Sequence, residues 1–170
     1  TLLRPLAGTA SSNVPSSELL ITYRGGTAFV PAATLGKDER PALIIGGTTH
    51  AGMNNYIVTA TVEAVGRDGR MWAFPSLKNA RSDARAFRVD DGVLVVGGWA
   101  AQSYKNPELA ARKLPMEWLP SSALDGKAGW VEVVGPGPAV DSAVAQLQNG
   151  SLLEVGAAGE MTQWKPVLPA

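Results

Sequence analysis

Short apolar runs, separated by glycine-containing and polar turns, make up most of the chain after residue 17. The runs are ELLITYR from Glu18, TAFVPAATL, PALIIGG, YIVTATVEAV, MWAFPSL, ARAFRV, VLVVGG, PMEWLPSS, GWVEVVG, AVAQLQNG and SLLEVG. Runs of this length that are rich in β-branched residues are typical of strands. Asp90-Asp91-Gly92 and Asn149-Gly150 stand between consecutive runs and favour tight hairpins, so we expect about eleven strands, paired antiparallel.

Two segments with some helical character need separate interpretation. NPELAARKL, from Asn106, offers a cap and an early proline, and we expect one or two helical turns there inside a long loop. AVDSAVAQLQ carries its apolar residues at every second position and is therefore predicted to be a strand. Residues 1–17 have no sustained period and predict a flexible arm, without the charged start and apolar stretch of a signal peptide.

The most informative feature is an internal repeat. The doublets Gly46-Gly47 and Gly97-Gly98 lie 51 residues apart, and each follows an apolar run. A glutamate and then a tryptophan follow each doublet: Glu63 and Trp72 in the first copy, Glu117 and Trp130 in the second. A weaker third copy begins at Ala139, and its doublet is Gly156-Ala157. A period of roughly 50 residues is typical of propeller blades.

This pattern resembles the kelch repeat, in the form common in bacterial exported propellers of the galactose-oxidase type. The family's conserved arginine matches Arg81 in the second copy, Arg24 is the candidate in the first, and Val140 replaces it in the third. The resemblance implies an all-β fold of about three four-stranded antiparallel blades, a partial or half propeller. The expected boundaries are the arm 1–17 and a propeller segment 18–170, with blades of about 27–79, 80–136 and 137–170 and a strand at 18–25.

Scaffold roles are expected for the repeated residues. Glycines permit tight turns and close backbone approach, tryptophans fill the space between neighbouring sheets, and a buried arginine and glutamate satisfy partners between repeats. The structural kelch positions are Gly46, Gly47, Glu63, Trp72, Gly97, Gly98, Glu117 and Trp130. Trp72 and Trp130 are both predicted to be buried between blades.

Three blades cannot close a ring, because propellers have 4–8 blades around the channel. The ring is completed by another copy of the chain or by a companion chain, or else the chain is part of a longer propeller. We expect Glu18 to Arg24 to supply a missing outer strand to the third blade of the partner, which gives a six-bladed ring with a two-fold axis when the partner is a second copy.

Composition excludes several classes of function. Lys and Arg together number 15, and Asp and Glu together also number 15, so the formal net charge is zero. This argues against a nucleic-acid binder, which needs a basic face. There is no cysteine, and one histidine is too few for a typical zinc or copper site. The copper chemistry of galactose oxidase is thereby excluded for this chain alone. No apolar run is long enough to span a bilayer, and no cofactor motif is present.

Candidate ligand residues cluster in the loops that form one end of a propeller. These loops are Thr48 to Asn55, Lys78 to Asp83, Trp99 to Arg112 and Gly135 to Asp141. The candidate ligand-binding residues are His50, Asn54, Asn55, Arg81, Trp99, Tyr104 and Arg112. Aromatic, amide and arginine side chains around a mouth suit a glycan or a peptide, and the alternative is that the loops are simply solvated.

The sequence favours a non-catalytic binding or assembly module that works through its loops or its open edges. No catalytic residue or metal ligand is assigned. The alternative is a carbohydrate-active propeller enzyme that resembles sialic-acid mutarotases and recruits His50, Arg81 and Glu108. A third interpretation is a structural subunit of a heteromeric ring. The polar arm and the resemblance to exported propellers favour an extracytoplasmic location, either secreted or periplasmic.

Overall fold

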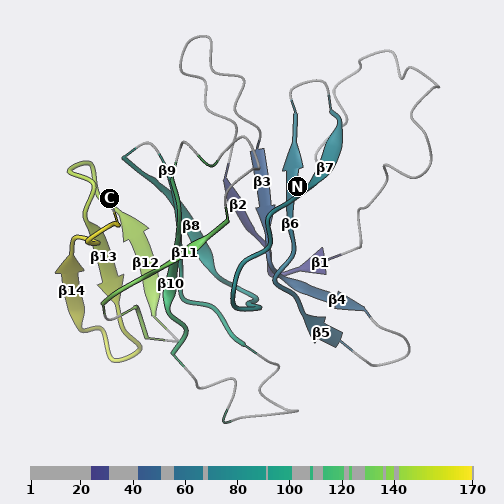
Figure 1. Ribbon diagram of the computed structural model, residues 1–170. Coiled ribbons are helices and arrows are strands. Elements are labelled where there is room, and N and C mark those ends of the chain that lie inside the picture. The colour runs from purple at the N-terminus through teal and green to yellow at the C-terminus, as the bar shows by residue number, and fades with distance from the viewer. Residues whose placement is uncertain are drawn as a thin grey trace.

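The fold is built from β-strands. The computed structural model describes residues 24–30, 42–50, 56–66, 69–90, 92–100, 108, 113–120, 123, 129–135, 137–139 and 142–169. Every named element within these residues is a strand, and the strands pair antiparallel in four sheets, none of which is closed (Figure 1). The all-β prediction is confirmed, and the arrangement is consistent with blades of a partial propeller.

Three of the sheets follow one another along the chain. Sheet 1 has the order β2-β3-β6-β7, formed by Ala28–Val30, Ala42–Ile45, Val62–Val65 and Met71–Phe74. Sheet 2 has the order β8-β9-β10-β11, formed by Arg85–Val89, Gly92–Val96, Met116–Leu119 and Val131–Val133. Sheet 3 has the order β12-β13-β14, formed by Ala143–Gln146, Leu152–Val155 and Met161–Trp164.

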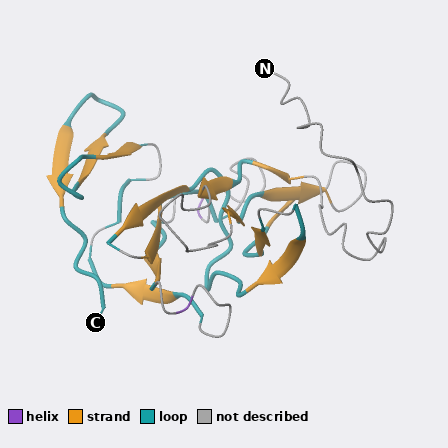
Figure 2. Cartoon of the chain, turned by 90° about the horizontal axis from the view of Figure 1, so that it is seen from above, coloured by secondary structure: helices purple, strands orange, loops and turns teal. Residues whose placement is uncertain are grey.

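A small fourth sheet extends sheet 1 at one end. It has the order β1-β4-β5, formed by Arg24–Gly25, Thr48–His50 and Tyr56–Val58. Figure 1 shows sheet 3 on the left, sheet 2 in the middle and sheet 1 on the right, with the small sheet below sheet 1. Seen from above, the strands form successive groups along the molecule (Figure 2). The first strands of sheets 1 and 2, β2 and β8, contact each other.

One apolar core lies between sheets 1 and 2 and a second lies between sheets 2 and 3, so sheet 2 contributes to both. We call the face of a sheet toward the preceding sheet its leading face, and the opposite face its trailing face. Side chains of β9 alternate between the cores: Val93 and Val95 face sheet 1, whereas Leu94 and Val96 face sheet 3. All of β9 is buried, which explains why its sequence is uniformly apolar. Burial of each large apolar side chain contributes about 1.5–3 kcal/mol.

The predicted strands agree with the structure in most of the described residues. AVDSAVAQLQ contains strand β12, as its two-residue period predicts, and β8 pairs antiparallel with β9 up to Val89 and Gly92, as the hairpin signal before Gly92 predicts. The expected helical turn after Asn106 lies outside the described residues, except for Glu108, which is helical. The arm 1–17 and the segment 18–23 also lie outside the described residues.

The prediction of one continuous strand in YIVTATVEAV is wrong. Strand β5 ends at Val58 and β6 begins at Val62, and the two belong to different sheets. The backbone between them turns toward the start of the second repeat: Leu77 N donates to Ala60 O at 2.9 Å and Arg81 N to Thr59 O at 3.2 Å. These bonds from a distant segment take the place of ladder bonds, a tertiary effect that a local pattern does not reveal.

Two further strands lie where the sequence predicts none. Thr48–His50, expected to be part of a loop, forms β4 because Arg24–Gly25 pairs on one side and Tyr56–Val58 on the other. Met161–Trp164 forms β14 after a tight turn, in which Gly159 N donates to Gly156 O and Gly156 N to Glu160 O. Among the described residues, no helix is long and apolar enough to cross a bilayer.

Candidate functional site

The glycine doublets pack closely against the backbone at the start of the second repeat. Gly46 and Gly47 have φ values of +62° and +104°, in the left-handed region that favours glycine. A Cβ on Gly46 would collide with the carbonyl oxygen of Arg81, and Gly47 N donates to that oxygen at 2.8 Å. In the second doublet, a Cβ on Gly98 would lie 2.7 Å from the carbonyl oxygen of Ser82. Both doublets therefore pack against the start of the second repeat, one from the preceding repeat and one from within the second repeat itself.

Glu117 holds the segment that connects sheet 1 to sheet 2. Its carboxylate is fully buried and accepts the backbone N–H of Lys78 at 2.6 Å and that of Asn79 at 3.0 Å. The same carboxylate accepts Arg81 Nη2 at 2.7 Å. One side chain therefore binds two consecutive amides and a guanidinium of the connection.

Arg81 is fully buried, and its donors are directed at the scaffold. Nη2 also donates to Pro115 O at 2.8 Å, and Nη1 donates to Gly97 O at 3.1 Å. Burial lowers the pKa of Arg81 from its ordinary value, and the adjacent Glu117 carboxylate acts in the opposite direction. The sequence assigns Arg81 both a scaffold role and a ligand role, and these contacts are those of a scaffold residue.

The two repeat tryptophans behave differently. Trp130 is 2% exposed, and its Nε1 donates to Pro75 O at 2.8 Å, so the prediction of burial between sheets is confirmed. Trp72 is 43% exposed, and the same prediction is wrong for it.

Strand register explains the exposure of Trp72. Trp72 pairs with the residue that follows Glu63. In sheet 2 the residue that follows Glu117 pairs with Val131, so Val131 is the equivalent of Trp72, and it is 40% exposed. The residue equivalent to Trp130 is Met71. A shift of one residue moves a side chain to the other face of a sheet, so the spacing of the tryptophans along the chain misaligned the two outer strands by one position.

A first polar pocket lies where the small sheet meets the start of the second repeat. It has a volume of about 350 Å³ and is lined by Gly25, Gly26, Thr48, His50, Tyr56, Ser82 and Asp83. His50 and Tyr56 are opposite each other in β4 and β5, with ring centroids 4.5 Å apart in an edge-to-face arrangement. The two rings line the pocket together with the hydroxyl and carboxylate groups.

A chain of hydroxyl groups leads to the carboxylate of Asp83. Thr48 Oγ1 donates to Ser82 Oγ at 3.0 Å, and Ser82 Oγ donates to Asp83 Oδ2 at 2.9 Å. Asp83 has a φ of +56°, a strained conformation for a residue with a side chain, and its N–H donates to Gly26 O at 2.7 Å. Its side chain is exposed, and Oδ1 accepts no hydrogen bond from the described residues. Asp83 therefore presents a fixed acceptor to solvent.

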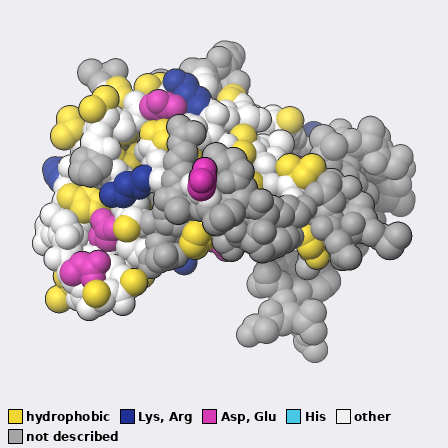
Figure 3. Space-filling model, turned by 90° about the horizontal axis from the view of Figure 1, so that it is seen from below, with side chains coloured by type: hydrophobic (Ala, Val, Ile, Leu, Met, Phe, Trp, Pro, Cys, Tyr) yellow, Lys and Arg dark blue, Asp and Glu magenta, His cyan; other side chains and the backbone are white. Residues whose placement is uncertain are grey.

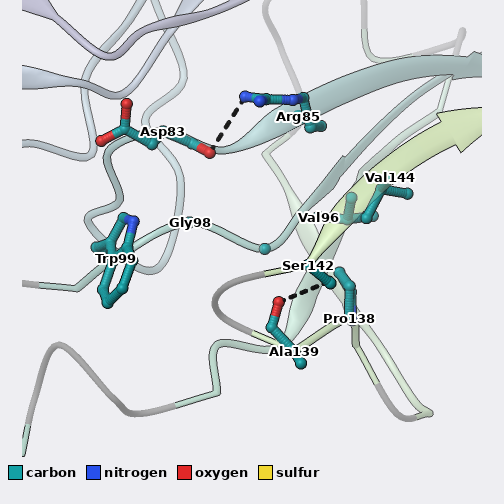
Figure 4. A pocket seen from close by; sticks show the side chains of 10 residues that line it. Asp83, Arg85, Val96, Gly98, Trp99, Pro138, Ala139, Ser142 and Val144 are labelled. Carbon is teal, nitrogen blue, oxygen red and sulfur yellow. Dashed lines mark hydrogen bonds between the residues drawn. The ribbon is translucent and has the colours of Figure 1, made fainter. Parts of the chain in front are cut away.

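A second pocket lies at the matching place between sheets 2 and 3. Its volume is about 190 Å³, and its polar lining includes Asp83, Arg85, Trp99 and Ser142 (Figure 4). Arg85 donates to Asp83 O at 3.4 Å, and Ser142 Oγ donates to Ala139 O at 2.8 Å. Both pockets begin beside a glycine doublet, and Asp83 lines both.

The predicted ligand residues therefore have different locations. His50 lines the first pocket and Trp99 the second, whereas Asn54, Asn55, Tyr104 and Arg112 lie outside the described residues. Sequence reasoning did not single out Tyr56, Asp83 or Arg85. Asp83 stands two residues after Arg81 in the repeat, so the repeat register could have identified it as a residue beside the doublet.

The described linings of the two pockets offer a carboxylate, a guanidinium, hydroxyls and aromatic rings, and Asp83 is the only carboxylate among these residues. Within the described parts of the chain, no group of three or more histidine, aspartate or glutamate side chains could hold a metal ion. A carboxylate, hydroxyls and aromatic rings are the groups with which proteins recognise polyhydroxylated or peptide ligands.

No known family model matches this chain, and no curated protein matches it.

Proposed function

We propose that the chain is a non-catalytic binding and assembly module of the kelch type. It completes a propeller ring together with another copy or a companion chain, and it binds a glycan or a protein at the end that carries the glycine doublets. The kelch assignment is supported by the paired doublets, the Arg81–Glu117 pair and the buried Trp130. The polar residues 1–17 and the resemblance to exported propellers support an extracytoplasmic location.

The assembly part of the proposal is supported by apolar side chains that are exposed on the first and last sheets of the described residues. Phe29, on the leading face of sheet 1, is 58% exposed, and Met161, on the trailing face of sheet 3, is 72% exposed. Equivalent faces inside the chain are buried against a neighbouring sheet. Figure 3 shows apolar side chains at the surface on the left, the side of sheet 3 in Figure 1. Exposed large apolar side chains such as Phe29 and Met161 are the kind of residue that a partner could cover.

Native mass spectrometry and light scattering at several concentrations test the assembly. The expected result is a defined oligomer above the chain mass of 17.7 kDa, which dissociates on dilution. A chain that stays monomeric and soluble at every concentration overturns assembly with its own copies, and the companion chain then has to be sought by co-purification.

The ligand-binding part of the proposal is supported by Asp83, which lines both pockets. The test is a glycan array that includes neutral and acidic oligosaccharides, probed with the full chain, with Asp83→Asn and with Asp90→Asn. Both aspartates have a positive φ, which asparagine tolerates, but Asp90 lies in the β8–β9 hairpin, outside both pockets. We expect Asp83→Asn to weaken binding at least tenfold and Asp90→Asn to leave it unchanged. Equal binding by all three proteins, or no binding to any glycan, overturns the glycan assignment.

A carbohydrate-active enzyme that resembles sialic-acid mutarotases is the second candidate. Arg85 favours it, because a guanidinium in the second pocket offers a partner for the carboxylate of a sialic acid. Anomeric exchange of N-acetylneuraminic acid, followed by NMR with and without the protein, separates the two functions. Acceleration of the exchange that is lost in Arg85→Met would replace the non-catalytic proposal.

A further inference from the structure

The hydroxyl groups of the first pocket direct their protons into the protein. An ionised carboxylate only accepts hydrogen bonds, so Ser82 Oγ is the donor in its 2.9 Å bond to Asp83 Oδ2. A serine hydroxyl has one proton, so Thr48 Oγ1 is the donor in the 3.0 Å bond between Thr48 and Ser82. Both hydroxyl protons are thereby used. What these three side chains still offer a ligand is acceptor oxygens, among them Asp83 Oδ1.

The carboxylate of Asp83 belongs to the first pocket, and its carbonyl oxygen belongs to the second. Arg85 Nη1 donates to the carbonyl oxygen, and Figure 4 shows the carboxylate pointing away from Arg85. On the side of the first pocket, a Cβ on Gly26 would lie 2.8 Å from Asp83 Oδ1 and would collide with Ser82 Oγ. A side chain at Gly26 would therefore occupy space beside these oxygens that the glycine leaves open.

The first pocket carries a negative charge that no described residue neutralises. Asp83 is the only carboxylate among its described lining residues, which include neither lysine nor arginine. Asp83 forms no ion pair with any described residue. Arg24 pairs with Thr49, so its position in the small sheet belongs to the row that alternates with the pocket-lining position Thr48. The second pocket differs, because the guanidinium of Arg85 lines it.

Two aromatic rings lie on the same face of the small sheet as Thr48. His50 and Tyr56 pair across β4 and β5, and their ring centroids are 4.5 Å apart in an edge-to-face arrangement. Tyr56 is 41% exposed, so part of its ring is available to a ligand. The face of an aromatic ring attracts a cation, and the alkyl stem of a lysine packs on apolar surface while its ammonium group stays at a polar end. Rings next to a carboxylate are the complement of such a side chain.

We propose that the first pocket binds a lysine side chain of a partner protein. An ammonium group has three donors and no acceptor, which suits a lining whose hydroxyl and carboxylate oxygens only accept. Donation to Asp83 Oδ1 is a charge-assisted hydrogen bond, which is stronger than a bond between neutral groups. A sugar hydroxyl both donates and accepts, and the hydroxyls of Thr48 and Ser82 have no proton left for it. The inference rests on the proposed ligand-binding function and names the class of ligand for this pocket.

NMR titration of the isotope-labelled full chain tests this pocket with three small probes. Nα-acetyl-lysine amide carries the ammonium group, Nα-acetyl-norleucine amide has the same four-carbon stem without it, and glucosamine is an amino sugar. The pH is fixed slightly above neutral, where lysine is charged and histidine is ordinarily neutral. We expect the lysine probe to shift the backbone amide signals of Gly26, Ser82 and Asp83 and to bind at least tenfold more tightly than the other two. Added salt should weaken its binding.

Two substitutions of aspartate by asparagine separate the charge from the fold. Asp83→Asn removes the charge, keeps the size and places an asparagine at a φ of +56°, which this residue type tolerates. Asp90→Asn makes the same change at a φ of +48°, outside both pockets. We expect Asp83→Asn to bind the lysine probe at least tenfold more weakly and Asp90→Asn to bind it as the parent does. Tyr56→Leu should weaken binding by about threefold or more, because it removes a ring face.

The outcomes distinguish this ligand from binding in general. Equal affinity for the lysine and norleucine probes, or an Asp83→Asn protein that binds lysine as well as Asp90→Asn does, overturns the lysine assignment. Glucosamine bound more tightly than the lysine probe also overturns it, because the ligand is then an amino sugar. In these cases the binding function stands. If Asp83→Asn does not fold, the ratio of lysine to norleucine affinity in the parent protein decides. No shift with any probe overturns the assignment, and if no glycan binds on the array either, the proposed binding function falls with it.

Discussion

Replacement of Glu117 by glutamine should destabilise the fold far more than loss of one surface charge would. Oε2 accepts Lys78 N, and Oε1 accepts Asn79 N and Arg81 Nη2, at distances between 2.6 and 3.0 Å. A glutamine keeps one oxygen and places an NH₂ group where the second oxygen was. One backbone N–H then faces another donor, and the buried guanidinium loses its counter-charge.

The magnitude follows from burial. Removal of one partner of a buried ion pair costs about 3–5 kcal/mol, because the remaining charge is left without compensation. A buried backbone donor without an acceptor costs about 1–3 kcal/mol, and the two effects overlap in one site. We therefore expect Glu117→Gln to lower the free energy of unfolding by about 3–5 kcal/mol.

The simultaneous replacement of Arg81 and Glu117 by methionine distinguishes this site from a simple ion pair. Buried ion pairs can often be exchanged for apolar residues of similar volume without loss of stability. Here the carboxylate also binds two backbone amides, which methionine cannot do. The double variant should therefore remain at least about 2 kcal/mol less stable than the parent.

Urea unfolding followed by tryptophan fluorescence, at fixed protein concentration, measures these changes. Glu132→Gln is the matched control, because Glu132 lies directly opposite Glu117 but is exposed and accepts only the Asn79 side chain among the described contacts. We expect the control to change stability by less than about 1 kcal/mol. A Glu117→Gln protein no less stable than Glu132→Gln would refute the view that this carboxylate joins the two sheets.

Two more pairs of substitutions test the packing. Trp130→Ala should cost about 3–5 kcal/mol in thermal or urea unfolding, whereas Trp72→Ala should cost about 1 kcal/mol or less; equal losses would contradict the one-residue correction of the outer strands. Gly92→Ala should cost about 1–3 kcal/mol, because its Cβ would collide with the ring of Trp118. Gly129→Ala, where a Cβ meets nothing within 4 Å, should be nearly neutral, and a similar loss at both sites would contradict the packing around β9.

The sequence predicted those parts of the fold that depend on local pattern. Apolar runs of four or five residues form strands β3 and β9, and β8 and β9 pair as a hairpin on either side of the predicted turn, because burial and turn chemistry act within a few residues. The break in YIVTATVEAV could not be predicted in this way. It depends on hydrogen bonds from Leu77 and Arg81, which reach Ala60 and Thr59 from the segment that connects sheet 1 to sheet 2.

The candidate site was predicted only in outline. His50 and Trp99 line pockets beside the doublets, as their positions after Gly47 and Gly98 suggested. Asp83 was included only as the end of a loop, because nothing in its sequence context signals a positive φ or a place between two pockets. Its conformation results from the hydrogen bond to Gly26, a residue 57 positions away.

The third repeat shows that the bond between a carboxylate and the incoming backbone is retained even when the sequence motif is not. By register, Thr162 stands in the place of Glu117, and the motif is therefore lost. However, Glu154, on the neighbouring strand, accepts the backbone N–H of Ala139 at 2.6 Å. The repeat alignment predicts that Val140 replaces Arg81, but Ala139 stands four residues before β12, as Arg81 stands four residues before β8. Ala139 therefore occupies the place of Arg81, and the carboxylate has moved from the third strand to the second. Within the described residues, sheet 3 therefore joins the preceding sheet through a carboxylate of its second strand instead of its third.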